Sequence, residues 1–111
     1  MALLPTYNER SDFELGVTLT DTDGDPLTPD TAHYSVYDTA SEALLVDWTE
    51  FTVTAGDGTI EVPTEATAIV TSSNSYETRV LTVALTYAGG KEHHEEYWFR
   101  VKNLQAIPRA T

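Results

Sequence analysis

The sequence of 111 residues predicts an all-β domain, namely an antiparallel β-sandwich of about seven strands with one short helical turn. Three observations lead to this prediction. Apolar residues recur at every second position in several stretches, which is typical of strands that bury one face. Turn-forming residues separate these stretches about every 8 to 15 residues. Threonine is abundant, and residues that favour helices gather in one short segment.

The clearest element is a hairpin over residues 76–102. Its first strand has apolar side chains at the odd positions from 81 to 87. Gly89 and Gly90 favour a tight turn, because glycine adopts a positive φ without strain, but they leave the register of the hairpin open. The return strand alternates in the same way. Its inward residues are Tyr97, Phe99 and Val101, and its outward residues are Trp98, Arg100 and Lys102.

The other strands are predicted from the same alternation. Residues 12–20 show it most regularly, and residues 32–38 and 59–63 show it over shorter lengths. Residues 44–54 change phase between Trp48 and Phe51, which indicates a bulge or a corner where the chain passes to the other sheet. Trp48 is a candidate for the tryptophan that fills the middle of such a sandwich.

Residues 64–70 are the one segment with helical character. Thr64 is a suitable N-cap, and Glu65 suits the positive end of a helix. A helix of one or two turns is too short to be stable alone. We therefore expect it to close one end of the sandwich.

The two ends of the chain lack strand periodicity. We expect an N-terminal arm of residues 1–11, a β-sandwich domain of residues 12–103 and a C-terminal tail of residues 104–111. Pro108 keeps the tail out of a sheet interior. The arm either packs on its own domain, is mobile, or lies on a neighbouring subunit.

The charge of the chain is strongly negative, with 18 acidic residues, 6 basic ones and a net charge of −12. No Lys or Arg occurs between Ser11 and Thr78. Such a surface repels phosphate backbones, so we expect no binding to nucleic acid. The pattern fits either a self-repelling soluble domain or an acidic body that docks through a basic edge.

Hydropathy and cysteine content also limit the classes of protein to which this chain can belong. No stretch approaches the ~20 apolar residues of a membrane span, and the first residues do not form a signal peptide, so we expect no membrane partner. The sequence has no cysteine, which excludes disulfides, thiolate metal sites and thiol nucleophiles. This composition fits synthesis in a reducing compartment.

One acidic turn has the spacing of a calcium loop. Asp21, Asp23 and Asp25 match the first three ligand positions of an EF-hand, but Pro26 stands where glycine is needed and Ala32 where a bidentate Glu is needed. The three aspartates form a candidate for a weak cation site. The alternative is a turn in which Asp and Gly supply the backbone angles.

A second cluster lies at the start of the return strand. His93 and Glu95 share one strand face, and His94 and Glu96 share the other. Neither pair supplies the three or four ligands that zinc requires, so we favour a solvated hairpin end over a metal site.

No pattern in the sequence indicates catalysis. No serine lies in a nucleophile elbow, and no glycine loop is suited to hold a phosphate. Acidic pairs are so numerous that none can be assigned as acid and base. The sequence therefore predicts a protein that is not an enzyme and has no cofactor.

The outward aromatic residues favour a protein interface. Trp98 is expected between Glu96 and Arg100 on the outer face, and exposed Trp and Arg together are typical interface anchors. The alternative is a tryptophan that lies across its own sheet. With the apolar chain ends, the candidate partner-binding residues are Leu3, Leu4, Tyr7, Trp98, Arg100, Lys102, Leu104 and Ile107.

Several segments, taken together and in order, resemble one family. They are LPTYNE at 4–9, DFELGVTLTDTDGD at 12–25, AIVTSSN at 68–74, ETRVLTV at 77–83 and YWFRVKNL at 97–104. They are similar to small proteins of tailed bacteriophages and prophages that are encoded among virion structural genes, most of them with no described function. More loosely, the first strand and its Asp-Gly turn resemble immunoglobulin-like domains of phage tail and baseplate proteins. The resemblance implies an immunoglobulin-like sandwich with a structural role and no catalytic residues.

We therefore expect a non-enzymatic virion protein, made in the bacterial cytoplasm, that binds other virion subunits. It would be a capsid decoration or cement protein, or a neck- or tail-associated protein, present as a homo-oligomer or in many copies. The alternative is a host-surface or glycan-binding module. In that case outward aromatic residues such as Tyr37 and Trp98 line a concave site.

Overall fold

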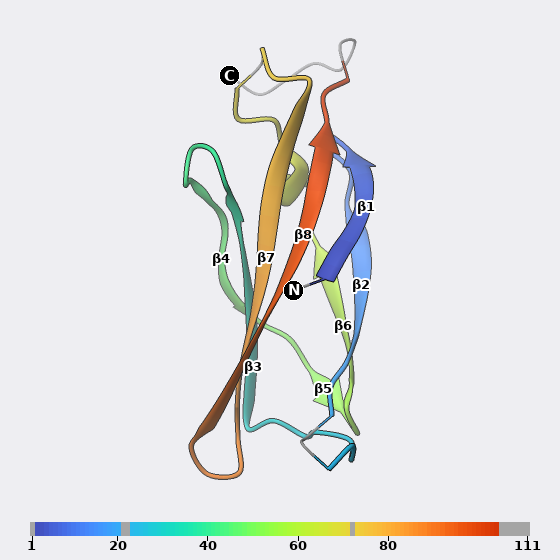
Figure 1. Cartoon of the computed structure of the whole chain (residues 1–111), viewed down its shortest axis with the longest axis vertical. Helices are drawn as coiled ribbons and strands as arrows, with labels where there is room; N and C mark the ends of the chain where they lie inside the picture. The colour runs from blue at the N-terminus through green and yellow to red at the C-terminus, as the bar shows by residue number, and fades with distance from the viewer. Residues whose placement is uncertain (1, 21–22, 72, 105–111) are drawn as a thin grey trace.

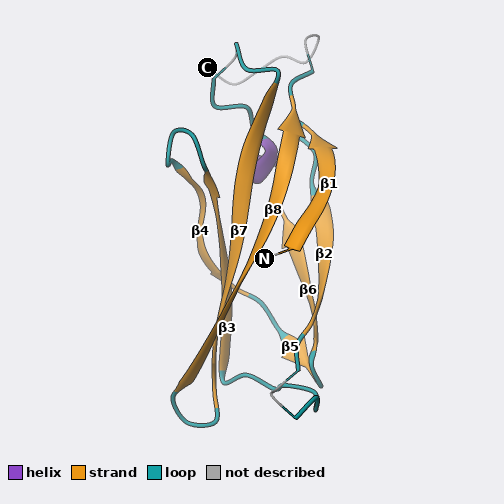
Figure 2. Cartoon of the chain, in the orientation of Figure 1, coloured by secondary structure: helices purple, strands orange, loops and turns teal. Residues whose placement is uncertain are grey.

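The computed structural model describes residues 2–20, 23–71 and 73–104, which form a sandwich of two β-sheets (Figures 1 and 2). The larger sheet has the strand order β1-β8-β7-β3-β4, and the smaller sheet has the order β2-β6-β5. The strands are β1 (Ala2–Asn8), β2 (Phe13–Thr18), β3 (Thr31–Asp38), β4 (Leu44–Glu50), β5 (Val53–Thr54), β6 (Asp57–Val62), β7 (Tyr76–Tyr87) and β8 (Lys91–Lys102). The predicted all-β sandwich is confirmed, with eight described strands in place of about seven.

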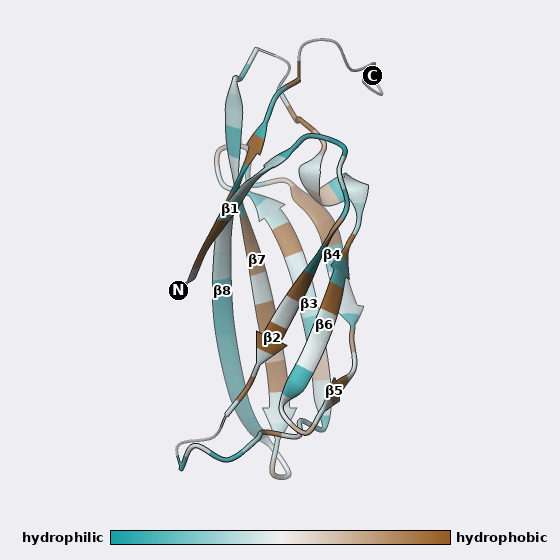
Figure 3. Cartoon of the chain, turned by 90° about the vertical axis from the view of Figure 1, so that its right-hand side faces the viewer, coloured by the Kyte–Doolittle hydropathy of each residue, from teal (hydrophilic) through white to brown (hydrophobic). Residues whose placement is uncertain are grey.

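The core lies between the two sheets and consists of the alternating apolar positions (Figure 3). Along β2 and β6 burial alternates from residue to residue, so each strand turns one face inward. On the larger sheet Val36, Leu81 and Phe99 have no exposed surface. In Figure 3 the smaller sheet lies in front of the larger one and covers one of its faces. We call the opposite face of the larger sheet the outer face, and no other described strand covers it.

The hairpin of β7 and β8 forms as predicted, and the structure defines its register. Tyr76 pairs with Lys102 at one end and Tyr87 with Lys91 at the other. Residues 88–90 form the turn, and all three have a positive φ. The two glycines of this turn adopt that conformation without strain. The inward and outward residues of β8 are those that the sequence predicts.

The N-terminal segment differs from the prediction. Residues 2–8 are not an arm but strand β1, which extends the larger sheet at its edge and runs parallel to β8. Among the described strands, this is the one parallel pair. Leu4 and Tyr7 pack against the core, and the Tyr7 ring stacks on Phe13 with centroids 3.8 Å apart. Pro5, which has no N–H to donate, lies where the pairing with β8 shifts register, as is usual for proline in an edge strand.

The change of phase after Trp48 is confirmed as a change of sheet. β4 is an edge of the larger sheet, and the chain then passes to β5 in the smaller sheet. Phe51 and Val53 pack against the core after this corner. Trp48 does not fill the middle of the sandwich, because it lies on the edge strand β4 with 51% of its surface exposed. Its assignment as a central tryptophan is therefore wrong.

The predicted helix is a single 3-10 turn, η1 (Thr64–Thr67), and its N-cap is Pro63. Thr64 therefore does not act as the cap, and no side chain caps the turn. Ala66 and Thr67 are buried, so η1 closes one end of the space between the sheets, at the upper end in Figure 1. The described residues contain no helix with the length and apolar character to cross a membrane.

A network of charged residues is buried near this end. Arg79 on β7 has no exposed surface, and its guanidinium binds the carboxylates of Asp38 on β3 (2.5 Å) and of Glu77 (2.8 Å). It also donates a hydrogen bond to the carbonyl oxygen of Ala68 (2.6 Å). Glu77 accepts hydrogen bonds from two backbone N–H groups of the loop after η1, both at 2.8 Å. The network therefore joins β3 and β7 to this loop.

Replacing Arg79 tests the network. The variant Arg79→Met leaves two buried carboxylates without a counter-charge, and breaking a buried ion pair costs about 3–5 kcal/mol. We expect a loss of this size in the free energy of unfolding, measured by urea denaturation at pH 7. The matched control Lys91→Met removes an exposed cation from the neighbouring strand and should cost less than about 1 kcal/mol. Equal losses in the two variants would contradict the assignment.

The stability of the fold should depend on pH through Glu77. Burial alone raises the pKa of this carboxyl, but the backbone donors, Arg79 and Asn74 outweigh burial and hold the pKa below its usual value of 4.5. The folded state thus binds this proton more weakly than the unfolded chain does. The ionised Glu77 carboxylate therefore stabilises the fold at pH values above 4.5, and this contribution is lost as the pH falls through the lowered pKa. We expect Glu77→Gln to be less stable than the wild type at pH 7, with a difference that narrows in acid. Urea unfolding over a pH series measures this, and a constant difference would refute it.

Candidate interaction surface

The outer face carries an apolar row that crosses all five strands of the larger sheet. Cross-strand pairing joins Leu3 to Trp98, Trp98 to Val80, Val80 to Tyr37, and Tyr37 to Leu44. Residues that pair directly across strands share a face of the sheet. We call these five residues the apolar row. Its two ends are exposed, Leu3 by 83% and Leu44 by 54%, whereas Val80 at its centre is fully buried.

Basic side chains flank the apolar row on one side. Arg100 and Lys102 follow Trp98 at alternate positions of β8, so they share its face, and both are exposed. The Arg100 guanidinium lies 4.2 Å from the centroid of the Tyr76 ring, a cation–π contact that restrains it against the sheet. No ion pair joins Arg100 or Lys102 to a residue of the described ranges.

Acidic side chains flank the row on the other side. Glu92 and Glu96 precede Trp98 on the same face of β8, and both are exposed. On β4, Glu50 adds a carboxylate to this half of the sheet, 4.0 Å from the imidazole of His33. Along the strand direction of β8, the outer face therefore changes from negative to apolar to positive.

The structure brings together half of the candidate partner-binding residues and separates the rest. Those that meet on the outer face are Leu3, Trp98, Arg100 and Lys102. The apolar side chains of β1 that face the core are Leu4 and Tyr7, so these two are not free for a partner. Leu104 is half-buried, and its backbone N–H donates to the carboxylate of Glu9. Ile107 lies outside the described residues.

Trp98 combines the two roles that the sequence leaves open. Its side chain is half-buried, so part of the ring lies on its own sheet and part reaches the surface. The indole N–H is buried and has no hydrogen-bond acceptor among the described residues. Trp98 is therefore an aromatic group that packs partly on its own sheet and partly reaches the outer surface, one strand away from Val80 at the centre of the row.

Sequence reasoning missed two members of this surface, Tyr76 and Leu44. Tyr76 joins it because the hairpin register places it beside Arg100, and the two glycines of the turn had left that register open. Leu44 joins it because the register of β3 and β4 shifts next to Tyr37. A local irregularity of this kind gives no signal in the apolar periodicity.

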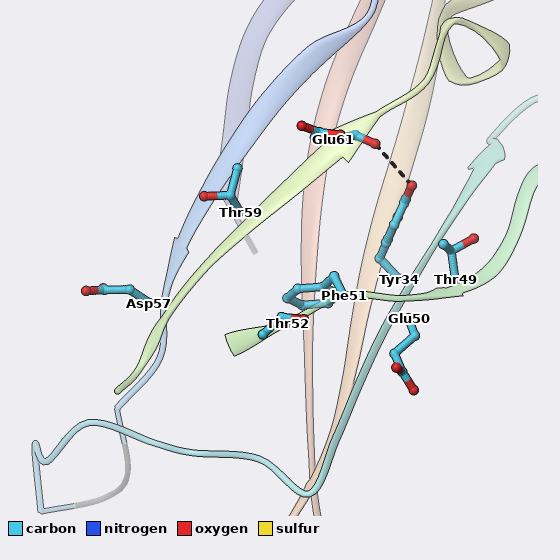
Figure 4. A pocket seen from close by; sticks show the side chains of 8 residues that line it. All are labelled: Tyr34, Thr49, Glu50, Phe51, Thr52, Asp57, Thr59 and Glu61. Atoms are coloured by element: carbon cyan, nitrogen blue, oxygen red, sulfur yellow. Dashed lines mark hydrogen bonds between the residues drawn. The ribbon is translucent and has the colours of Figure 1, made fainter. Parts of the chain in front are cut away.

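A separate hollow of about 560 Å³ lies between β4 and β6 (Figure 4). The rings of Tyr34 and Phe51 meet there edge to face, with centroids 6.2 Å apart. The Tyr34 hydroxyl donates to the backbone carbonyl of Glu61 at 3.3 Å. Neither Tyr37 nor Trp98 lines this hollow, although these are the aromatic residues predicted to form a concave site.

The predicted cation ligands are not assembled into a site in the described residues. Asp21 lies outside the described ranges, and Asp23 and Asp25 are exposed. Residues 2–20, 23–71 and 73–104 contain no group of three or more His, Asp or Glu side chains that is placed to hold a metal ion. The calcium hypothesis thus rests on the aspartate spacing alone.

The second cluster forms a chain of contacts along β8. His93 lies 3.3 Å from one carboxylate oxygen of Glu95, and the Tyr97 hydroxyl donates to the other at 2.9 Å. Burial, followed by the hydrogen bond and the charge of Glu95, raises the pKa of Tyr97 to about 12. The hydroxyl therefore keeps its proton at neutral pH, where it can donate a hydrogen bond but cannot act as a base.

Comparison with known proteins finds no match among family models, curated proteins or solved structures. The geometry of the outer face is therefore the main basis for a functional proposal.

Substitutions of two leucines of β1 can distinguish a structural role of this strand from a binding role. Leu4 packs on the core and Leu3 is exposed. We expect Leu4→Ala to lower the free energy of unfolding by about 1–3 kcal/mol, less than for a fully buried leucine, and Leu3→Ala to change it by less than about 0.5 kcal/mol. Urea denaturation compares the two. If neither substitution matters, the segment does not pack on the core as a strand of the sheet.

Proposed function

We propose that this chain is a non-enzymatic structural subunit of a tailed-phage particle and that it binds other virion proteins through the outer face of its larger sheet. The observation that supports this most is the apolar row, which ends in exposed leucines and is flanked by basic side chains on a face that no other described strand covers. Aromatic and arginine side chains gathered beside exposed apolar surface are typical of a protein interface.

The assignment to a virion rests on the resemblance of the quoted segments to small phage structural proteins. In this proposal the protein is made in the host cytoplasm and is incorporated in several copies, as a capsid decoration or cement protein or as a neck or tail component. The net charge of −12 supports a position away from packaged DNA, because an acidic surface is repelled by phosphate.

The alternative, a host-surface or glycan-binding module, depends on other residues. Tyr37 and Trp98 lie on β3 and β8 with β7 between them, and neither lines the hollow of Figure 4. A glycan would instead occupy the hollow, where Phe51 adjoins threonine hydroxyls. The two functions therefore predict different sensitive residues, Trp98 for subunit binding and Phe51 for glycan binding.

Incorporation into particles tests the proposal. Tagged variants are expressed in bacteria that carry the gene, and their copy number in purified particles is measured by quantitative mass spectrometry. We expect the wild type in particles, and a loss of about tenfold or more for the double variant Trp98→Ala with Arg100→Glu, because both interface anchors are removed.

The controls are Glu14→Arg, on the exposed face of the smaller sheet, and Phe51→Ala, each shown to be folded by circular dichroism. Both should be incorporated like the wild type. Absence of the wild type from particles would refute the virion assignment. Incorporation that depends on Phe51 and not on Trp98 would move the functional site to the hollow.

A further inference from the structure

We infer that the outer face binds a second copy of this chain, packed face to face about a two-fold axis that runs along the apolar row. This inference rests on the proposed function, because it names the subunit that the outer face would bind. It follows from the order of charges on β8, from the size of the face and from the distribution of charge over the rest of the domain.

The outward positions of β8 next to Trp98 carry opposite charges at equal spacing. Glu96 lies two residues before Trp98, and Arg100 lies two residues after it. Further out the spacing is unequal, because Lys102 lies four residues after Trp98, opposite His94 in this arrangement, and Glu92 lies six residues before it. A strand with this order is complementary to itself when one copy is turned end over end about Trp98.

Only one of the two simple face-to-face arrangements uses this complementarity. A two-fold axis along the apolar row reverses the strand direction, so Glu96 of each copy lies opposite Arg100 of the other, and each residue of the row meets its own equivalent. A two-fold axis along β8 keeps the strand direction and places Arg100 near Arg100 of the second copy. The first arrangement gives two attractive charge pairs and the second gives repulsion, so the charges select the first.

The outer face offers enough area for a weak dimer. Five strands with neighbours about 4.8 Å apart span about 19 Å, and the overlap about Trp98 covers residues 94–102 of β8, about 30 Å of strand. The product is at most about 600 Å² per partner, which is the size of a small or transient interface. Twisted sheets packed in this way keep their strands within about 30° of parallel or antiparallel alignment, which the reversed strand direction satisfies.

The net charge of −12 opposes self-association in general, but not on this face. The outer positions of β8 carry two carboxylates, Glu92 and Glu96, and two cations, Arg100 and Lys102. On the smaller sheet, by contrast, Glu14 pairs directly with Glu61, so two such faces would repel each other. The outer face of the larger sheet, unlike that of the smaller sheet, therefore offers cations that can pair with carboxylates of a second copy.

Reciprocal charge reversal tests the dimer. In Arg100→Glu two carboxylates oppose each other on both sides of the row, and in Glu96→Arg two cations do so. We expect each variant alone to raise the dissociation constant of the dimer by about tenfold or more, measured by sedimentation equilibrium and light scattering. An equimolar mixture of the two should restore a dimer, because both charge pairs are then attractive. Glu14→Arg, on the smaller sheet, should remain as dimeric as the wild type.

The inference is supported if the wild type is a dimer, each single variant dimerises more weakly, and the mixture of the two variants forms a dimer again. The inference is overturned if the wild type is a monomer at about 100 μM, if the single variants dimerise like the wild type, or if the mixture stays monomeric. The proposed function is judged separately by the particles. Incorporation that depends on Trp98 without a solution dimer would mean that the face binds a different virion protein, whereas a dimer that never enters particles would refute the virion role and leave the dimer standing.

Discussion

The contact between Arg79 and its two carboxylates sets the register on which the rest of the structure depends. Arg79 and Asp38 are direct partners in the pairing of β7 with β3, and both lie on the face that turns toward the core. A slip of one residue would move each side chain to the opposite face. Buried ion pairs often add little net stability over apolar residues of the same size. Here the pair excludes a wrong register, because the slipped arrangement would leave Asp38 without its cation.

The same network also fixes the loops at one end of the sandwich. Glu77 accepts hydrogen bonds from the loop after η1 and from the side-chain amide of Asn74 at 2.9 Å. Asn103, just beyond β8, donates its side-chain amide to the carbonyl of Asn74 at 2.7 Å. The end of β8 is thereby joined to the start of β7 through polar groups in partly buried positions. These groups would be costly to leave unpaired, so the loop conformation and the strand register stabilise each other.

The register also determines which chemistry the outer face presents. β7 and β8 pair over twelve residues, so fixing β7 against β3 fixes every position of β8. The residues Phe99 and Val101 then face the core, and the alternate residues Trp98 and Arg100 face outward. The apolar row forms only in this register, because one residue from each of the five strands must pair directly with the next across the sheet. The arrangement of this exposed surface is thus a consequence of an interaction buried on the other side of the sheet.

Sequence reasoning was reliable where the signal is local. The hairpin, its inward and outward residues and the change of sheet after Trp48 all follow from a period of two and from turn residues. It failed for β1, because Pro5 and a register shift hide the alternation and because parallel pairing with β8 depends on a strand far away in the chain. Arg79 carried an overlooked signal: a charged residue in the same phase as Leu81 requires a buried counter-charge.

The outer face could be predicted only in part for the same reason. Trp98, Arg100 and Lys102 were placed together because they share one strand. Leu3 and Leu44 were not placed beside Trp98, because their position depends on pairings between strands that are distant in sequence or irregular in register. An alternation with a period of two predicts which face of the sheet a residue occupies. Which residues of the adjacent strands lie beside it is determined by the register of strand pairing.

The distribution of charge gives the acidic composition a physical role beyond solubility. A domain with a net charge of −12 repels its own copies in most orientations, and this repulsion acts against non-specific association. Attraction then requires a region where positive charge is concentrated, and Arg100 and Lys102 supply it beside Trp98. The exposed leucines at the ends of the row add apolar surface that gains stability when it is covered, but this gain has no direction. In the proposed dimer, the order of charges along β8 would determine which way round the second copy lies.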